Sequence, residues 1–129
     1  MDGAEPSVYE RVGGNPFFEA LVDRFYDAVE TDALLRPLYP ADPAAFRAAQ
    51  DHLCSFLVQY WGGPGDYSAA RGHPRLRLRH AGVRIGSAER DAWYRHMADA
   101  VRASRLAPED EQELLGYFSV AATHMINAG

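Results

Sequence analysis

The chain has 129 residues, of which 47% are apolar, and its 13 basic and 18 acidic side chains give a formal charge of −5. This length and apolar content predict a single domain over residues 1–129, with residues 1–7 as a flexible N-terminus. The negative charge argues against nucleic-acid binding. Every basic residue is an arginine, which excludes a lysine Schiff base and a phosphate-binding loop with its lysine.

The compartment is predicted from what the sequence lacks. No apolar run approaches the roughly 18 residues that span a bilayer. The N-terminal MDGAEPS has neither the basic start nor the apolar stretch of a secretory signal. A single cysteine, Cys54, cannot form an internal disulfide, as is typical of a reducing compartment. These observations predict a cytoplasmic protein without a membrane span.

The first half of the chain predicts two helices. One begins at Asn15-Pro16, with Asn15 as the capping residue and Pro16 at the first helical position. Its apolar residues follow at helical spacing: Phe18, Leu21, Val22, Phe25 and Val29. Pro37 and Pro40 predict a break around Tyr39. A second helix is expected from Asp42-Pro43 to the Gly62-Gly63-Pro64 stop, with an inward stripe of Phe46, Ala49, Leu53, Phe56, Leu57 and Tyr60.

The second half predicts two more helices after an irregular segment. Residues 65–85 are rich in Gly, Pro and Arg and are expected to contain one helical turn near residues 76–80. Ser87 is expected to cap a third helix, and Pro108 to begin a fourth with an acidic first turn that complements the helix dipole. The apolar faces are Trp93, Met97, Ala100 and Val101, and then Leu114, Leu115, Phe118, Ala121, Ala122, Met125 and Ile126. No segment shows a convincing strand period, so the sequence predicts an all-α fold.

The residues alone leave the chemistry open. The five histidines lack metal-protease spacing, and the sequence has no nucleophile elbow, although a Ser-His-Asp or Cys-His pair stays open. Five arginines and no acid lie between residues 69 and 87, a pattern typical of a solvated loop, with an anion site as the alternative. His80 lies in this segment and would offer a haem both an axial nitrogen and cations near its propionates. A single histidine, however, is more often a surface or core residue.

Longer strings of the sequence resemble a known family. The string QYWGGPGDYSAARGHPRLRLRHAGVRI, followed by ERDAWYRHM, is similar to the truncated haemoglobins of group II. The similarity continues upstream through DRFYDAV and LYPAD and covers about residues 9–126. It implies a two-over-two helical sandwich around a haem. The sequence lacks the Cys-x-x-Cys-His attachment motif, so the haem is expected to be noncovalent haem b.

The resemblance also implies roles for single residues. His80 in RHAGV matches the proximal iron ligand. Tyr26 in RFY matches the helix-B tyrosine that faces the bound gas. Two further residues of the distal pocket match family positions: Tyr39 in LYP, at the corner after helix C, and Trp93 in DAW, on helix G. Further haem contacts are implied for Ala49, Leu53, Phe56, Tyr67, Arg71 and Arg79, of which Tyr67, Arg71 and Arg79 match residues that hold the propionates.

The three polar aromatic residues would also suit the core of any helical bundle. A buried hydroxyl or indole N–H nevertheless needs a partner. Three such donors in one cavity therefore predict a hydrogen-bond acceptor inside it, and bound dioxygen suits that description.

Two functions follow from the resemblance. The first is a haem protein that binds dioxygen, nitric oxide, carbon monoxide or hydrosulfide. The second is a haem oxidoreductase that converts nitric oxide and oxygen to nitrate, or a peroxidase-like enzyme. The sequence identifies no reductase to recycle the iron, and it is compatible with a monomer or a homodimer.

Overall fold

The computed structural model describes residues 6–65 and 83–127. Across these ranges the chain is helical, without a strand, and its elements are α1 (Val8–Val12), α2 (Asn15–Glu30), the 3-10 turn η1 (Arg36–Leu38), α3 (Pro43–Tyr60), α6 (Ser87–Ala103) and α7 (Pro108–His124). None of the helices in this part of the chain is long and apolar enough to cross a membrane. The predicted all-α class is confirmed.

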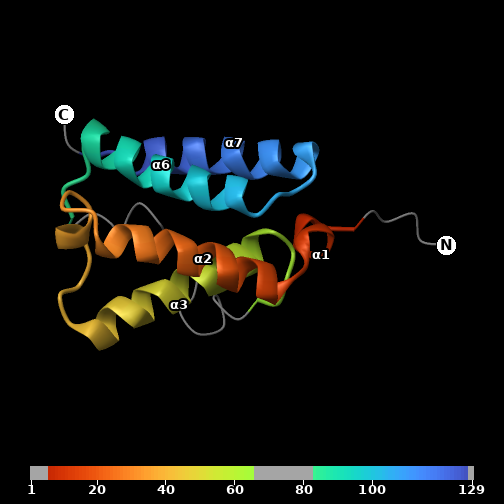
Figure 1. Ribbon diagram of the computed structural model, residues 1–129, viewed down its shortest axis with the longest axis horizontal. Helices are drawn as coiled ribbons and strands as arrows, with labels where there is room; N and C mark the ends of the chain where they lie inside the picture. Colours follow the sequence, from red (N-terminus) through yellow and green to blue (C-terminus); the bar gives the residue numbers. More distant parts are fainter. Residues whose placement is uncertain (1–5, 66–82, 128–129) are drawn as a thin grey trace.

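The four long helices form two pairs. Helix α2 packs against α3, and α6 packs against both α7 and α2. Figure 1 shows α6 and α7 side by side above α2 and α3, with the short α1 at one end. This is the two-over-two arrangement that the resemblance implies.

Helix α2 is central because its apolar stripe meets both of its neighbours. The five apolar positions predicted from the sequence are all fully buried: Phe18, Leu21, Val22, Phe25 and Val29. Burying such a side chain contributes about 1.5–3 kcal/mol. The helical period therefore fixes which face of α2 points inward, and Tyr26 on the same helix is also buried.

Two predicted helix caps are wrong and one is confirmed. Asp42 caps α3, since its side chain accepts the Ala45 N–H at 2.9 Å. Asn15 is instead the first residue of α2, and its side-chain oxygen accepts the Tyr9 hydroxyl at 2.7 Å. Ser87 is likewise the first residue of α6, where the Gly86 N–H donates to Glu89 at 2.8 Å. At both starts a glycine takes the capping position. Gly14 does so with a φ of 72°, a left-handed conformation that glycine adopts readily.

Helix α1 has no hydrophobic period by which it could have been predicted. This helix begins with a capping box in which Ser7 and Glu10 bond each other's backbone N–H. The Tyr9 N–H donates to the Trp61 carbonyl at 3.0 Å. A Cβ at Gly63 would lie 2.7 Å from the Tyr9 ring, so glycine is required where α1 meets the end of α3.

Candidate ligand-binding site

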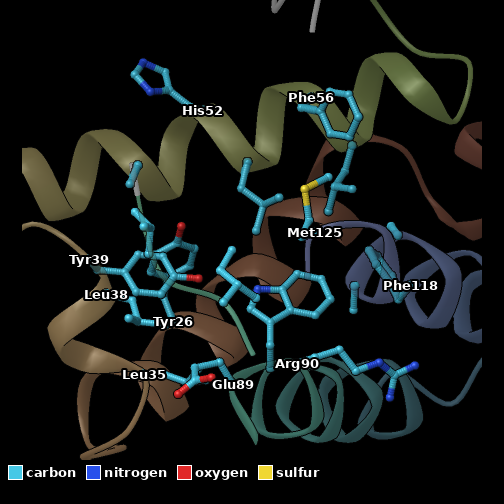
Figure 2. Close-up of a pocket in the computed structure, with 18 of the residues that line it drawn as sticks. Tyr26, Leu35, Leu38, Tyr39, His52, Phe56, Glu89, Arg90, Phe118 and Met125 are labelled. Carbon is cyan, nitrogen blue, oxygen red and sulfur yellow. The ribbon is translucent and has the colours of Figure 1, made fainter. Parts of the chain in front are cut away.

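One large cavity of about 480 Å³ lies between the corner after α2 and helices α3, α6 and α7. Its volume is in the range of small-molecule and cofactor sites. Apolar side chains make up most of its walls, among them Leu35, Leu38, Leu53, Phe56, Phe118 and Met125. In Figure 2, Tyr26 and Tyr39 lie together at one end of the cavity, and Phe118 and Met125 lie at the other.

Six of the residues predicted for the site line this cavity: Tyr26, Tyr39, Ala49, Leu53, Phe56 and Trp93. They come from α2, from the corner after it, from α3 and from α6. The other four, Tyr67, Arg71, Arg79 and His80, lie outside the described residues. The predicted distal donors and the predicted apolar wall therefore share one cavity, and the roles assigned to them stay predictions.

Tyr39 is positioned by the corner between α2 and α3. Asp32 accepts the N–H groups of Leu34 and Leu35 at 2.8 and 3.1 Å through one carboxylate oxygen. Its other oxygen lies 2.6 Å from the Nε2 of His96. Because His96 is on α6, this pair ties the corner to the helix that carries Trp93.

Arg36 fixes the far side of the same corner. Its guanidinium donates to the Pro40 carbonyl at 2.8 Å and lies 4.1 Å from the centre of the Phe46 ring. The Phe46 ring in turn contacts the rings of Tyr26 and Tyr39, at centroid distances of 5.2 and 6.0 Å. Tyr39 is thereby held by its backbone as well as by its ring.

Tyr26 and Tyr39 contact each other edge to face, the geometry that aromatic pairs prefer. The rings of Tyr26 and Tyr39 are 5.5 Å apart at an angle of 77°. The Trp93 ring lies 5.1 Å from that of Phe25. Three polar aromatic residues from three elements thus line the same cavity.

Burial keeps the two phenols protonated. It raises the pKa of Tyr39 to about 12, although the hydrogen bond from Trp93 acts in the opposite direction. Burial, and then the neighbouring Tyr39, raise the pKa of Tyr26 far above its ordinary value. Both hydroxyls therefore retain a hydrogen at neutral pH that they can donate to a ligand.

Several lining residues carried no prediction for the site. Glu89, Arg90 and Tyr117 line the cavity, and so does His52. His52 is exposed, and it is one turn of α3 from both Ala49 and Phe56. Arg90 ties α6 to α7 through Ser119, at 2.8 Å. The one-turn spacing from two predicted wall residues is the only signal that could have pointed to His52.

Cys54 faces a second cavity, of about 410 Å³, between α2 and α3. Desolvation, and then the nearby acids Glu19, Asp51 and Asp23, raise the pKa of its thiol to about 11. A protonated, half-buried thiol behaves as a small apolar side chain. Within residues 6–65 and 83–127, no cluster of three His, Cys, Asp or Glu side chains is placed to hold a metal ion.

Comparisons with known proteins agree with this architecture. A family model described as bacterial-like globin matches residues 7–127. The group 2 truncated hemoglobin YjbI of Bacillus subtilis is 38% identical over 119 residues, which cover 92% of this chain and 87% of that protein.

Solved structures are similar over almost the whole chain. A thermostable hemoglobin from Thermobifida fusca has a TM-score of 0.90 and 48% identity, covering 95% of this chain and 98% of that one. A truncated oxygen-avid haemoglobin from Bacillus subtilis has a TM-score of 0.86 and 36% identity, covering 95% of this chain and all (100%) of that one.

Proposed function

The chain belongs to the bacterial-like globin family, as a group II truncated haemoglobin, and from this premise we propose that it holds haem b in the large cavity and retains dioxygen through Tyr26, Tyr39 and Trp93. Haem-based binding of small ligands is the general property of the family. The observation that carries the proposal is that three polar aromatic residues, Tyr26, Tyr39 and Trp93, line one mostly apolar cavity.

The described residues fit a haem. A porphyrin needs apolar walls and a dry space of several hundred cubic ångströms, and the cavity of about 480 Å³ between α3, α6 and α7 offers both. In the proposal His80 supplies the axial nitrogen, and Tyr67, Arg71 and Arg79 hold the propionates. Ala49, Leu53 and Phe56 form the wall on α3. Haem iron supplies, when bound, a position for dioxygen and other small ligands.

The distal residues would act as a connected donor network. In the proposal Trp93, which acts to lower the pKa of Tyr39, donates to the Tyr39 oxygen, polarises its hydroxyl and strengthens the bond that this hydroxyl donates in turn. Tyr26 packs against the Tyr39 ring and limits its rotation. A hydrogen bond to a partly charged acceptor contributes about 1.5–3 kcal/mol when its loss is measured by deletion. Two such bonds would slow ligand release by about a hundredfold or more.

Slow release favours a ligand-retaining or catalytic role over oxygen transport. The same donors would hold nitric oxide, carbon monoxide less strongly, and hydrosulfide. The second candidate function is an oxidoreductase that converts nitric oxide and oxygen to nitrate, or a peroxidase. It is favoured by the protonated phenols of Tyr26 and Tyr39, since such donors stabilise negative charge that develops on oxygen. The proposal places the protein in the cytoplasm, as a monomer or homodimer served by a separate reductase.

The test is the oxygen dissociation rate of the haem-loaded protein. Trp93→Phe and Tyr39→Phe are each expected to raise this rate about tenfold or more, corresponding to about 1.4 kcal/mol. Tyr26→Phe has a smaller effect, and the Tyr26/Tyr39 double change falls short of the sum because the two residues share one network. Tyr94→Phe is the matched control, because Tyr94 lies on α6 but does not line the cavity.

Three further outcomes sharpen this test. The carbon monoxide dissociation rate is expected to change much less, since carbon monoxide is the weaker acceptor. His80→Ala is expected to abolish the histidine-ligated ferrous spectrum. If none of the three distal substitutions changes the oxygen dissociation rate, these aromatic residues only pack in the cavity wall and donate no hydrogen bond to the ligand.

A further inference from the structure

The segment that leads into α6 is bonded to a single residue beyond the end of α7. The side-chain oxygen of Asn127 accepts the Ile85 N–H at 2.8 Å, and its side-chain NH₂ donates to the Val83 carbonyl at 2.7 Å. The backbone N–H of Asn127 donates to the Ile85 carbonyl at 2.8 Å. These three bonds (the Asn127 clamp) join residues that are 42 and 44 positions apart in the sequence.

An asparagine suits this place because its amide carries both an acceptor and a donor. The one side chain can therefore bond an N–H and a carbonyl that lie two residues apart on a neighbouring segment. A carboxylate of the same shape could accept the Ile85 N–H but has no hydrogen for the Val83 carbonyl. Asn127 is exposed, so water competes for these groups and the net stabilisation is modest. The clamp is thus better suited to fixing position than to stabilising the fold.

Both sides of the Asn127 clamp are attached to ordered helices. The Ile126 N–H donates to the Thr123 carbonyl at 3.2 Å, which continues the last turn of α7 up to the residue before Asn127. On the other side Gly86 follows Ile85 directly, and its N–H donates to Glu89 in the first turn of α6 at 2.8 Å. Figure 1 shows that the end of α7 lies beside the start of α6. An anchor of this kind can hold the segment that it bonds.

The Asn127 clamp lies at the wall of the large cavity. Val83 and Ile85 line this cavity from one segment, and Met125 lines it from the other. Val83 is only three positions after His80 in the sequence. A chain extends at most about 3.6 Å per residue, so His80 lies within about 11 Å of Val83 whatever the conformation between them. Fixing Val83 therefore restricts the space that His80 can occupy.

We propose that Asn127 is a positioning residue for the iron ligand: by holding Val83 and Ile85 against the end of α7, it keeps the His80 nitrogen at the haem iron. This role rests on the proposed binding of haem through His80. Loss of the clamp gives the ligand segment more freedom, so the bond between His80 and the iron weakens and the haem leaves faster.

The first test is spectroscopic and does not depend on ligand binding or turnover. The iron–histidine stretching band is recorded by resonance Raman spectroscopy on ferrous, haem-loaded protein. Asn127→Ala and Asn127→Asp both lack the bond to the Val83 carbonyl, and we expect a broader band at lower frequency in each. A band that keeps its wild-type frequency and width in either variant overturns the proposal.

The second test measures the rate of haem transfer to an excess of an acceptor apoglobin. Both Asn127 variants are expected to lose haem about tenfold faster than the wild type, which corresponds to about 1.4 kcal/mol. His124→Gln is the matched control, because His124 is exposed at the end of the same helix and is not among the described residues that line the cavity. Its band and its haem-loss rate should equal those of the wild type.

A second control separates positioning from a general loss of stability. Arg11→Gln breaks the bond to Asp110, at the opposite end of α7 from Asn127. This variant loses hydrogen bonds but leaves the clamp intact, so its iron–histidine band should not move. If the band shifts in Arg11→Gln as much as in Asn127→Ala, the effect is one of stability and the positioning role is wrong.

The outcomes also separate this role from the proposed function. Hydrogen exchange of the Ile85 N–H should be faster in Asn127→Ala than in the wild type, which shows that the clamp has been released. Faster exchange with an unchanged band and an unchanged haem-loss rate overturns the role of Asn127 alone. Protein that takes up no haem, or that keeps its iron–histidine band in His80→Ala, overturns the proposed function instead.

Discussion

The two ends of the large cavity are held in place by different forces. At the donor end, directional bonds of Asp32, His96 and Arg36 fix the corner that carries Tyr39. At the apolar end, Phe118 is 1% exposed, and its ring contacts those of Trp93 and Tyr117. The stability that packing contributes depends mainly on the apolar volume that is buried. The stability that a hydrogen bond contributes depends on the exact positions of its donor and acceptor. The apolar end should therefore carry more of the folding free energy, and the donor end more of the control over the ligand.

The largest effect is expected from breaking the apolar end. Phe118→Ala removes a fully buried ring and should lower the free energy of unfolding by about 3–5 kcal/mol. Chemical denaturation followed by circular dichroism measures this loss. The control on the same helix is Val120→Ala, which should change stability by less than about 0.5 kcal/mol because Val120 is 71% exposed. An equal loss in both variants would contradict the assignment of stability to this end.

Breaking the donor end should cost less stability but release the ligand faster. Asp32→Asn weakens the bonds to Leu34, Leu35 and His96, a loss of about 1.5 kcal/mol, since hydrogen bonds to a charged group contribute about 1.5–3 kcal/mol. The oxygen dissociation rate should rise severalfold as Tyr39 gains freedom. Asp99→Asn is the control, because Asp99 belongs to an exposed pair with Arg102 on α6. An unchanged oxygen dissociation rate in Asp32→Asn would show that the corner does not control ligand release.

A conservative substitution, Arg36→Lys, tests the side of the same corner that Arg36 holds. Arg36→Lys keeps the charge but loses the planar fork that bonds Pro40 and stacks on Phe46. We expect a loss of about 1 kcal/mol in the free energy of unfolding, the typical contribution of one intramolecular hydrogen bond. If the variant is as stable as the wild type in chemical denaturation, the guanidinium geometry is irrelevant and only its charge matters.

The smallest effect is a pH dependence. The hydrogen bond with His96, and then the N–H groups of Leu34 and Leu35, hold the pKa of Asp32 below its usual range. The charged form is thus favoured in the folded state, so its stabilisation is complete above the unfolded pKa of about 3.9 and is lost as the pH falls below it. The stability difference between wild type and Asp32→Asn should therefore shrink on acidification from pH 5 to about pH 3. A constant difference over this interval would contradict the assignment.

The fold was largely readable from the sequence because four of its helices are long and periodic. The inward faces of α2 and α7 follow directly from the spacing of residues such as Phe18, Phe25 and Phe118. The short α1 was missed because five residues are too few to show a period, although the Ser7–Glu10 capping box was visible. Asn15 and Ser87 were predicted as caps because both side chains are common at that position. These preferences do not reveal that the glycine before each residue is the actual cap.

The site was readable only in part. The resemblance predicted that Tyr26, Tyr39 and Trp93 belong to one site, and all three line the cavity. The corner bond between Asp32 and His96, however, joins residues on separate elements. No spacing along one helix encodes such contacts, so they require the tertiary structure. Tyr117 was missed for the same reason, whereas the one-turn spacing of His52 from Ala49 and Phe56 was visible in the sequence.

The bond between Arg11 and Asp110 has a consequence for the order in which the chain is built. It joins residues 99 positions apart at 2.9 Å, and Asp110 belongs to the first turn of α7. Helix α1 therefore leaves the ribosome well before α7 but completes its contacts only after α7 has followed. Contacts of such long range slow folding. During translation the face of α1 that contacts α7 stays uncovered until α7 has been synthesised. A nascent chain that stalls before α7 therefore leaves α1 exposed to proteases.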